Sequence, residues 1–154
     1  MAADIPIRTF AAEQIASRLG RLVFEIRNCG QTLEPEAVHQ LRVAIRRFNQ
    51  SLRAFRSLLP QRPVRKIRKQ TRRLMRRAGQ VRNRDIALAL LAQSKVSPRS
   101  ALSTRLASAR RQHQQTLAGL LQRYNKRDFS SRWRAALRMD RPAPQNGNQT
   151  QVAS

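Results

Sequence analysis

The chain has 154 residues, enough for one domain with a sizeable hydrophobic core. Lys and Arg number 32 against 8 Asp and Glu, so the formal net charge is +24. A compact domain with this charge repels itself, so the expected partner is a polyanion or an anionic surface: nucleic acid, polyphosphate or acidic lipid. Most of the basic residues are Arg, whose planar fork binds phosphate bidentately.

The cysteine content and the hydropathy pattern exclude several protein classes. The single cysteine, Cys29, excludes an internal disulfide and a zinc site built from several cysteines. No apolar run approaches the roughly 18 residues of a membrane span. The first residues lack the basic start and apolar centre of a signal peptide. We therefore expect a soluble, cytoplasmic protein.

Two amphipathic helices are expected in the first part of the chain. The first is predicted over Arg8 to Asn28, because its apolar residues recur every three or four positions. Gly30 is suited to the left-handed position that ends a helix. The second helix is predicted to begin at the stretch 34–36, where a proline and two carboxylates suit a helix start. Pro60 is expected to end it.

The third helix is predicted from Val64 and is also two-faced. Its apolar stripe is opposed by a row of Lys66, Arg73 and Arg77, with Lys69 and Arg76 beside it. The stretch 79–85 interrupts this pattern and predicts a kink or short break, after which residues 86–91 resume as helix. This last segment, rich in Ala and Leu, suits either the core or a partner surface.

The rest of the chain predicts one more long helix and a short one. The long helix is expected over Ala101 to Asn125, and the short one over Phe129 to Leu137, with Trp133 against the body. Residues 1–140 form the predicted domain, and the polar residues 141–154 are expected to be a disordered tail. No segment has the alternation of a strand. The predicted fold class is therefore all-α: an antiparallel bundle of four long helices plus a short C-terminal helix.

The second helix has two faces of different chemistry. At 100° per residue, Arg42, Arg46 and Arg53 fall within roughly 60° of His39, while the apolar residues form a separate stripe. Successive turns lie about 5.4 Å apart, so the arginines form a line suited to an extended chain of negative charge. A charged face that is merely solvated is the alternative interpretation.

The sequence offers no arrangement of residues for catalysis or metal binding. Its carboxylates are scattered, and it lacks a Gly-rich phosphate loop, a nucleophile elbow and a His–Glu zinc motif. His113 lies on an apolar stripe and is expected to be packed and hydrogen-bonded. His39 heads the Arg row and would add a pH-dependent contact near its reference pKa of about 6.5. We expect a binding protein with no enzymatic activity, cofactor or metal.

Two blocks of sequence resemble the signatures of the CHAD domain, the conserved histidine alpha-helical domain. The first is EAVHQLRVAIRR at 36–47, followed by LRAF at 52–55. The second is GQVRNRDI at 79–86, which is similar to the family pattern Gly-x-x-Arg-Asp-x-Asp-Val. The two blocks stand in the family's order with a basic helix between them, and the resemblance covers about Arg8 to Tyr124.

The resemblance implies a helical bundle that binds inorganic polyphosphate through basic residues lining a channel. Apart from the resemblance, association with polyphosphate granules is an expectation for the location, and a structural role, such as coating a granule surface, is an alternative function. Asp85 is expected to orient one of the binding arginines. The implied binding residues, which would line a groove between the second and third helices, are His39, Arg42, Arg46, Arg47, Arg53, Lys66, Lys69, Arg73, Arg77 and Arg82.

The chain departs from the family pattern in two ways. Asn83 stands where the second signature usually has Asp. CHAD domains commonly contain two helical halves, and this chain has the length of one, so either the channel is an open groove or a homodimer closes it. RNA or DNA binding is the alternative function, because the charge suits it equally. Against it, only 5% of the residues are aromatic and so able to stack on bases.

Overall fold

The structure is a computed structural model that describes residues 4–139, so the tail predicted at 141–154 lies outside the described residues. In chain order its elements are α1 (Asp4–Thr32), α2 (Pro35–Ala54), the 3-10 helix η1 (Arg56–Leu58), α3 (Gln61–Gln93), α4 (Ala101–Lys126) and α5 (Phe129–Ala136). The described residues contain helices and no strand, and the predicted all-α class is therefore confirmed.

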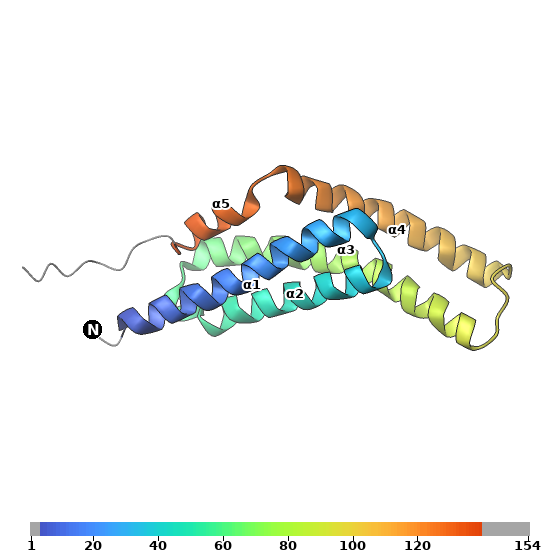
Figure 1. Cartoon of the computed structure of the whole chain (residues 1–154), viewed down its shortest axis with the longest axis horizontal. Coiled ribbons are helices and arrows are strands. Elements are labelled where there is room, and N and C mark those ends of the chain that lie inside the picture. Colours follow the sequence, from blue (N-terminus) through green and yellow to red (C-terminus); the bar gives the residue numbers. More distant parts are fainter. Residues whose placement is uncertain (1–3, 140–154) are drawn as a thin grey trace, which may run out of the picture.

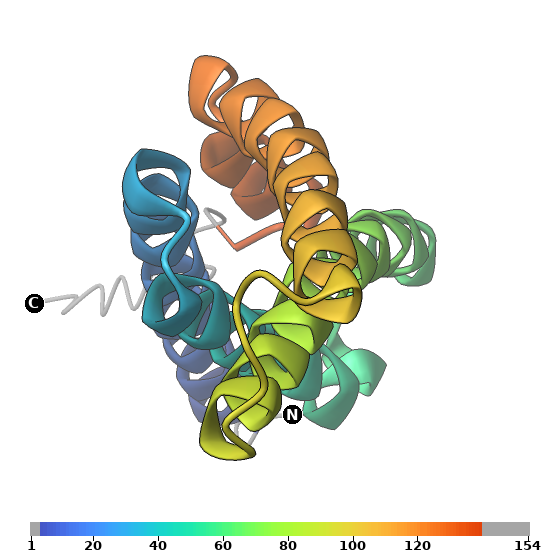
Figure 2. The same cartoon turned by 90° about the vertical axis from the view of Figure 1, so that its right-hand side faces the viewer.

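The four long helices form one bundle (Figure 1). Both α1 and α3 pack against α2 and α4, while α5 lies across one end against α1 and α3. At the other end, α3 and α4 continue beyond the turn between α1 and α2 as a two-helix hairpin, which Figure 2 shows end-on. The first part of α3 is therefore surrounded by three helices, and its last turns have α4 as their only helical neighbour among those described.

The core is built from the apolar stripes of these helices. Phe48 of α2 lies at its centre and stacks on Trp133 of α5, with ring centroids 5.7 Å apart. This contact agrees with the predicted position of Trp133 against the body. The largest fully buried apolar side chains are Ile15, Leu19, Leu22, Ile26, Leu41, Ile45, Phe48, Leu52, Leu74, Leu117 and Leu121.

Two predicted helix ends are wrong. The first helix continues through Gly30 to Thr32, and Leu33, with φ 51°, takes the left-handed position instead. Gly30 lies where α1 approaches α4, because a Cβ on it would come within 3.1 Å of Asn125 Nδ2. The second helix ends at Ala54, well before Pro60, and η1 fills the interval.

The short break predicted as one alternative at residues 79–85 is absent, because α3 runs through this stretch without interruption. The other alternative, a kink, stays a prediction. Val81 and Asp85 continue the buried stripe of Leu74 and Ala78 at steps of three and four, so packing holds the segment helical. A Cβ on Gly79 would meet nothing within 4 Å. This glycine therefore sits in an ordinary helical position beside open space.

The apolar residues at the hairpin end are not core residues. Ile86 and Leu90 of α3 and Leu102 of α4 are 43%, 56% and 53% exposed. Figure 1 shows the end of α3 and the start of α4 beyond the turn between α1 and α2, so neither α1 nor α2 covers this end of the hairpin. His113, expected to be packed, is only partly buried.

Candidate anion-binding groove

A groove of about 480 Å³ runs between α2 and α3. Arg42 contributes from α2, while arginines at successive turns of α3 contribute from the opposite side. None of its described lining residues is acidic or aromatic. The lining residues are Arg42, Asn49, Arg68, Arg72, Met75, Arg76, Gly79, Gln80 and Asn83.

The rotation of α3 about its axis determines which of its basic residues face α2. The Thr71 hydroxyl donates a hydrogen bond to Asn49 Oδ1 of α2 over 2.9 Å, which marks the side of α3 in contact with α2. Residues 68, 72 and 76 flank that contact on the open side of the groove. The row of α3 that lines the groove is therefore Arg68, Arg72 and Arg76.

Arg42 is the most confined cation of the groove. Its Nε is buried and has no hydrogen-bond partner in the described part of the chain. Burial lowers the pKa of Arg42 from its ordinary value, and the neighbouring positive charges of Arg46 and Arg82 lower it further. Three guanidinium groups from two helices thus lie close together, and an anion placed among them would relieve their mutual repulsion.

Carboxylates do little to neutralise this charge. Across residues 4–139 there are two ion pairs: Arg21 with Glu25 within α1, at 2.6 Å, and Arg110 with Asp85 between α4 and α3. Neither pair lies in the groove. The groove therefore keeps its positive charge available to an external anion.

The structure places the residues predicted on α2 on different sides of the helix. Arg42 lines the groove, and Arg46 and Arg53 are exposed on the same helix. His39 is partly buried one turn before Arg42. Arg47 instead lines a smaller cleft of about 260 Å³ between α1 and α2. The binding role of each stays a prediction.

The residues predicted on α3 are likewise divided between two sides. Arg82 lies near Arg42 on the groove side. Lys66 and Arg73 line a separate cleft between α3, α4 and α5, and Arg77 lies beside His113 of α4. The lining of the groove does not include Lys69, which is exposed.

The opposing row of Arg68, Arg72 and Arg76 was not among the predicted residues. Its spacing of four was visible in the sequence and matches the spacing of Arg42 and Arg46. However, α3 carries basic residues on every side that is not buried. The pattern alone therefore could not show which row faces α2.

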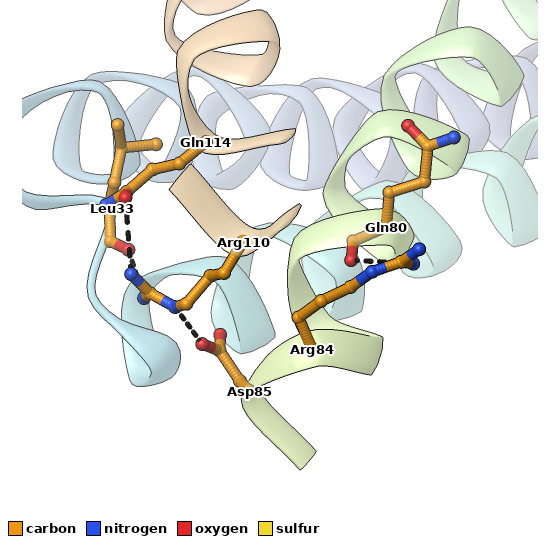
Figure 3. Close-up of polar contacts among 6 residues, drawn as sticks. All are labelled: Leu33, Gln80, Arg84, Asp85, Arg110 and Gln114. Atoms are coloured by element: carbon orange, nitrogen blue, oxygen red, sulfur yellow. Dashed lines mark hydrogen bonds and ion pairs between the residues drawn. The ribbon is translucent and has the colours of Figure 1, made fainter. Parts of the chain in front are cut away.

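A buried ion pair fixes the loop that leads into α2 (Figure 3). Asp85 Oδ1 accepts a hydrogen bond from Arg110 Nε of α4. The same guanidinium donates to the Leu33 carbonyl oxygen over 3.4 Å and to Gln114 Oε1 over 3.2 Å. Arg110 therefore connects α3 and α4 to the left-handed residue that precedes α2.

This geometry corrects the expectation that Asp85 orients one of the predicted binding arginines. Its partner is Arg110, which the sequence analysis did not select. Arg84, the neighbour of Asp85, contacts its own helix by donating to the Gln80 carbonyl oxygen over 3.4 Å. Asp85 thus supports the bundle and stands apart from the groove lining.

The described residues lack two other kinds of feature, a metal site and a membrane span. Nowhere between residues 4 and 139 do three or more His, Cys, Asp or Glu side chains gather in a way that could hold a metal ion. No described helix is long and apolar enough to span a membrane.

Comparison with known proteins identifies the family. The family model of the CHAD domain matches residues 13–154, nearly the whole chain. The chain belongs to the CHAD domain family. CHAD domains are linked in general to polyphosphate binding. Comparison with curated proteins and with solved structures gave no match.

Both CHAD signatures take part in the groove. The first signature forms α2 and supplies Arg42. The second lies within α3, where Gly79 and Asn83 line the groove and Asp85 forms the supporting ion pair. The position where the family pattern usually has Asp is therefore a groove position, and Asn83 leaves it without a negative charge in this CHAD domain.

Proposed function

We propose that this CHAD domain binds inorganic polyphosphate, without catalysis, in the groove between α2 and α3. The observation that supports this most strongly is the buried Nε of Arg42, which has no hydrogen-bond partner among the described residues, has cations beside it and belongs to neither ion pair. Arginine forks bind phosphate oxygens bidentately, and each phosphate bound releases counterions. The rows on α2 and α3 would follow the chain of phosphates along the groove.

The lining of the groove favours polyphosphate over nucleic acid. Single-stranded nucleic acids are held partly by stacking of bases on aromatic side chains. The described lining residues of the groove include no aromatic ring. A competition assay separates the two functions: polyphosphate should displace RNA or DNA at equal phosphate concentration, and displacement in the opposite direction would favour nucleic acid.

Substitution of the α2 arginines tests the assignment of the groove. Arg42→Ala combined with Arg46→Ala should weaken polyphosphate binding at least tenfold, because each charge-assisted hydrogen bond is worth about 1.5–3 kcal/mol. The matched control is Arg105→Ala with Arg111→Ala, which removes the same charge from exposed positions of α4. Circular dichroism checks that both variants stay helical. Equal binding by the two double variants would show that the groove is assigned wrongly.

We further propose that two copies meet at the hairpin end of α3 and α4, which would extend the basic surface. The exposed Ile86, Leu90 and Leu102 form an apolar end, and residues 86–94 carry no charge in a chain of net charge +24. Two identical basic chains repel least where they are uncharged. Light scattering should give a dimer mass that Leu90→Asp reduces to a monomer mass. A monomer mass for the parent with and without polyphosphate would contradict this.

The proposed cellular setting is the cytoplasm, at polyphosphate granules. A polyphosphate-binding protein with so many arginines outside ion pairs among residues 4–139 should concentrate where the polyanion is dense. A fluorescently tagged chain should therefore follow the granules, and the Arg42→Ala, Arg46→Ala double variant should not. A diffuse distribution of the parent in cells that contain granules would contradict the proposal.

A further inference from the structure

A second cleft, of about 760 Å³, lies on the other side of α3 from the groove. It is formed by the first half of α3, the last turns of α4, and α5 with the turn before it. It has no lining residue in common with the groove between α2 and α3. Its size is that of a typical small-molecule site.

Basic side chains from all three parts line this cleft. The described lining contains no carboxylate, and neither of the two ion pairs involves it. A ligand with several negative charges in a small volume would neutralise these cations. The basic lining residues are Arg62, Lys66, Arg73, Arg123, Arg127 and Arg132.

The rest of the lining is mostly apolar. Phe129 and Trp133 pack edge-to-face with ring centroids 4.9 Å apart, and Tyr124 packs on Phe129 at 5.1 Å. Trp133 Nε1 donates to Gln70 Oε1 of α3 over 3.2 Å, which fixes the indole against α3. The surface open to a ligand comes from the more exposed members of the set, among them Pro63, Leu120, Tyr124 and Ala136.

The combination of basic side chains and apolar surface differs from what inorganic polyphosphate requires. Inorganic polyphosphate is charged along its whole length, so it gains nothing from an apolar surface. A ligand that uses both parts of the cleft has a compact, multiply charged phosphate group and an apolar ring. The phenol of Tyr124 lies near Arg73, and burial raises its pKa while Arg73 lowers it in part. The phenol thus stays a hydrogen-bond donor at neutral pH.

We propose that the cleft between α3, α4 and α5 is a second anion site, which takes a nucleoside triphosphate. The triphosphate lies among the arginines, where their planar forks bind phosphate oxygens, and the base lies over the apolar part. The proposal does not depend on polyphosphate binding in the groove, because the two sites are lined by different residues.

The cleft contains its own reporter, because Trp133 is the single tryptophan of the chain. Titration of the full chain with ATP, without divalent cations, should change the tryptophan fluorescence in a saturable way. Tripolyphosphate and adenosine each supply one half of the ligand, so each should bind at least tenfold more weakly than ATP. Calorimetry on the Arg42→Gln, Arg46→Gln variant, in which the groove is weakened, checks the same three affinities independently of fluorescence.

Two pairs of substitutions separate this cleft from the rest of the basic surface. Arg73→Gln with Arg123→Gln, both exposed, should weaken ATP binding at least tenfold while the chain stays helical. Arg105→Gln with Arg111→Gln removes the same charge from exposed positions of α4 outside both sites and should leave ATP binding unchanged. The absence of saturable binding, equal affinity for tripolyphosphate and ATP, or equal effects of the two pairs would each overturn the proposal. These results can hold even if the groove does not bind polyphosphate. Equally, the groove can bind polyphosphate even if the cleft does not bind ATP.

Discussion

The ion pair between Asp85 and Arg110 makes a stability prediction that the structure lets us quantify. The Asp85 side chain is 5% exposed, and its Oδ2 is already buried with no hydrogen-bond partner among the described residues. Arg110→Ala would leave this carboxylate buried with no charge partner. Breaking a buried pair from one side in this way costs about 3–5 kcal/mol in the free energy of unfolding.

The reverse substitution should cost less. After Asp85→Ala, Arg110 keeps its contacts to Gln114 and to the Leu33 carbonyl oxygen, and its side chain is 20% exposed to water. We expect a loss of about 2 kcal/mol, the value of a hydrogen bond to a charged group. The double variant should lose less than the sum of the two, because removal of both partners leaves no isolated buried charge.

Urea unfolding followed by circular dichroism measures all three variants. The matched control is Arg84→Ala, the arginine next to Asp85, whose hydrogen bond is to its own helix and which should cost at most about 0.5 kcal/mol. If Arg110→Ala costs no more than Arg84→Ala, or if the double variant is simply additive, the ion pair does not support the bundle as described.

Three further predictions concern single residues. Gly20→Ala should stabilise the fold by about 0.5–1 kcal/mol in urea unfolding, because this helical glycine leaves room for a Cβ; a loss of stability would contradict that. Burial, and then Glu25, raise the pKa of the Cys29 thiol to about 12. The thiol should therefore resist thiol reagents in the folded protein and react after unfolding. Fast reaction of Cys29 in the native protein would contradict this. Burial, and then Arg84 and Arg77, lower the pKa of His113 in the folded state below its ordinary 6.5. The folded protein should therefore keep its full stability above about pH 6.5 and lose part of it as the pH falls through the lowered pKa of His113. His113→Gln should reduce this loss in thermal melts, and an unchanged pH profile would argue against it.

The helices were predictable because their apolar residues repeat with the helical period, and the bundle buries those stripes. Helix boundaries were less predictable from the sequence. Gly30 and Gly79 each indicated the end or interruption of a helix, but contacts between residues distant in the sequence keep both in helices. Gly30 stays helical where α1 meets α4, and Val81 and Asp85 keep α3 buried after Gly79. Such tertiary contacts leave no trace in a single sequence.

The candidate groove was predictable on one side only. The row on α2 that includes Arg42 and Arg46 follows from helical spacing and from the family signature. On α3, basic residues surround the buried stripe, so the row that faces α2 depends on a rotation that the contact between Thr71 and Asn49 defines. The partnership of Asp85 with Arg110 depends in the same way on the packing of α4 against α3.

The salt dependence of polyphosphate binding tests the central claim most directly. The arginines that line or flank the groove are Arg42, Arg46, Arg68, Arg72, Arg76 and Arg82. If each neutralises one phosphate, the logarithm of the affinity should fall with the logarithm of the salt concentration with a slope of about −4, by analogy with single-stranded nucleic acid. The Arg42→Ala, Arg46→Ala double variant should make the slope shallower by about 1.4. A slope near zero, or an unchanged slope in the double variant, would contradict binding in this groove.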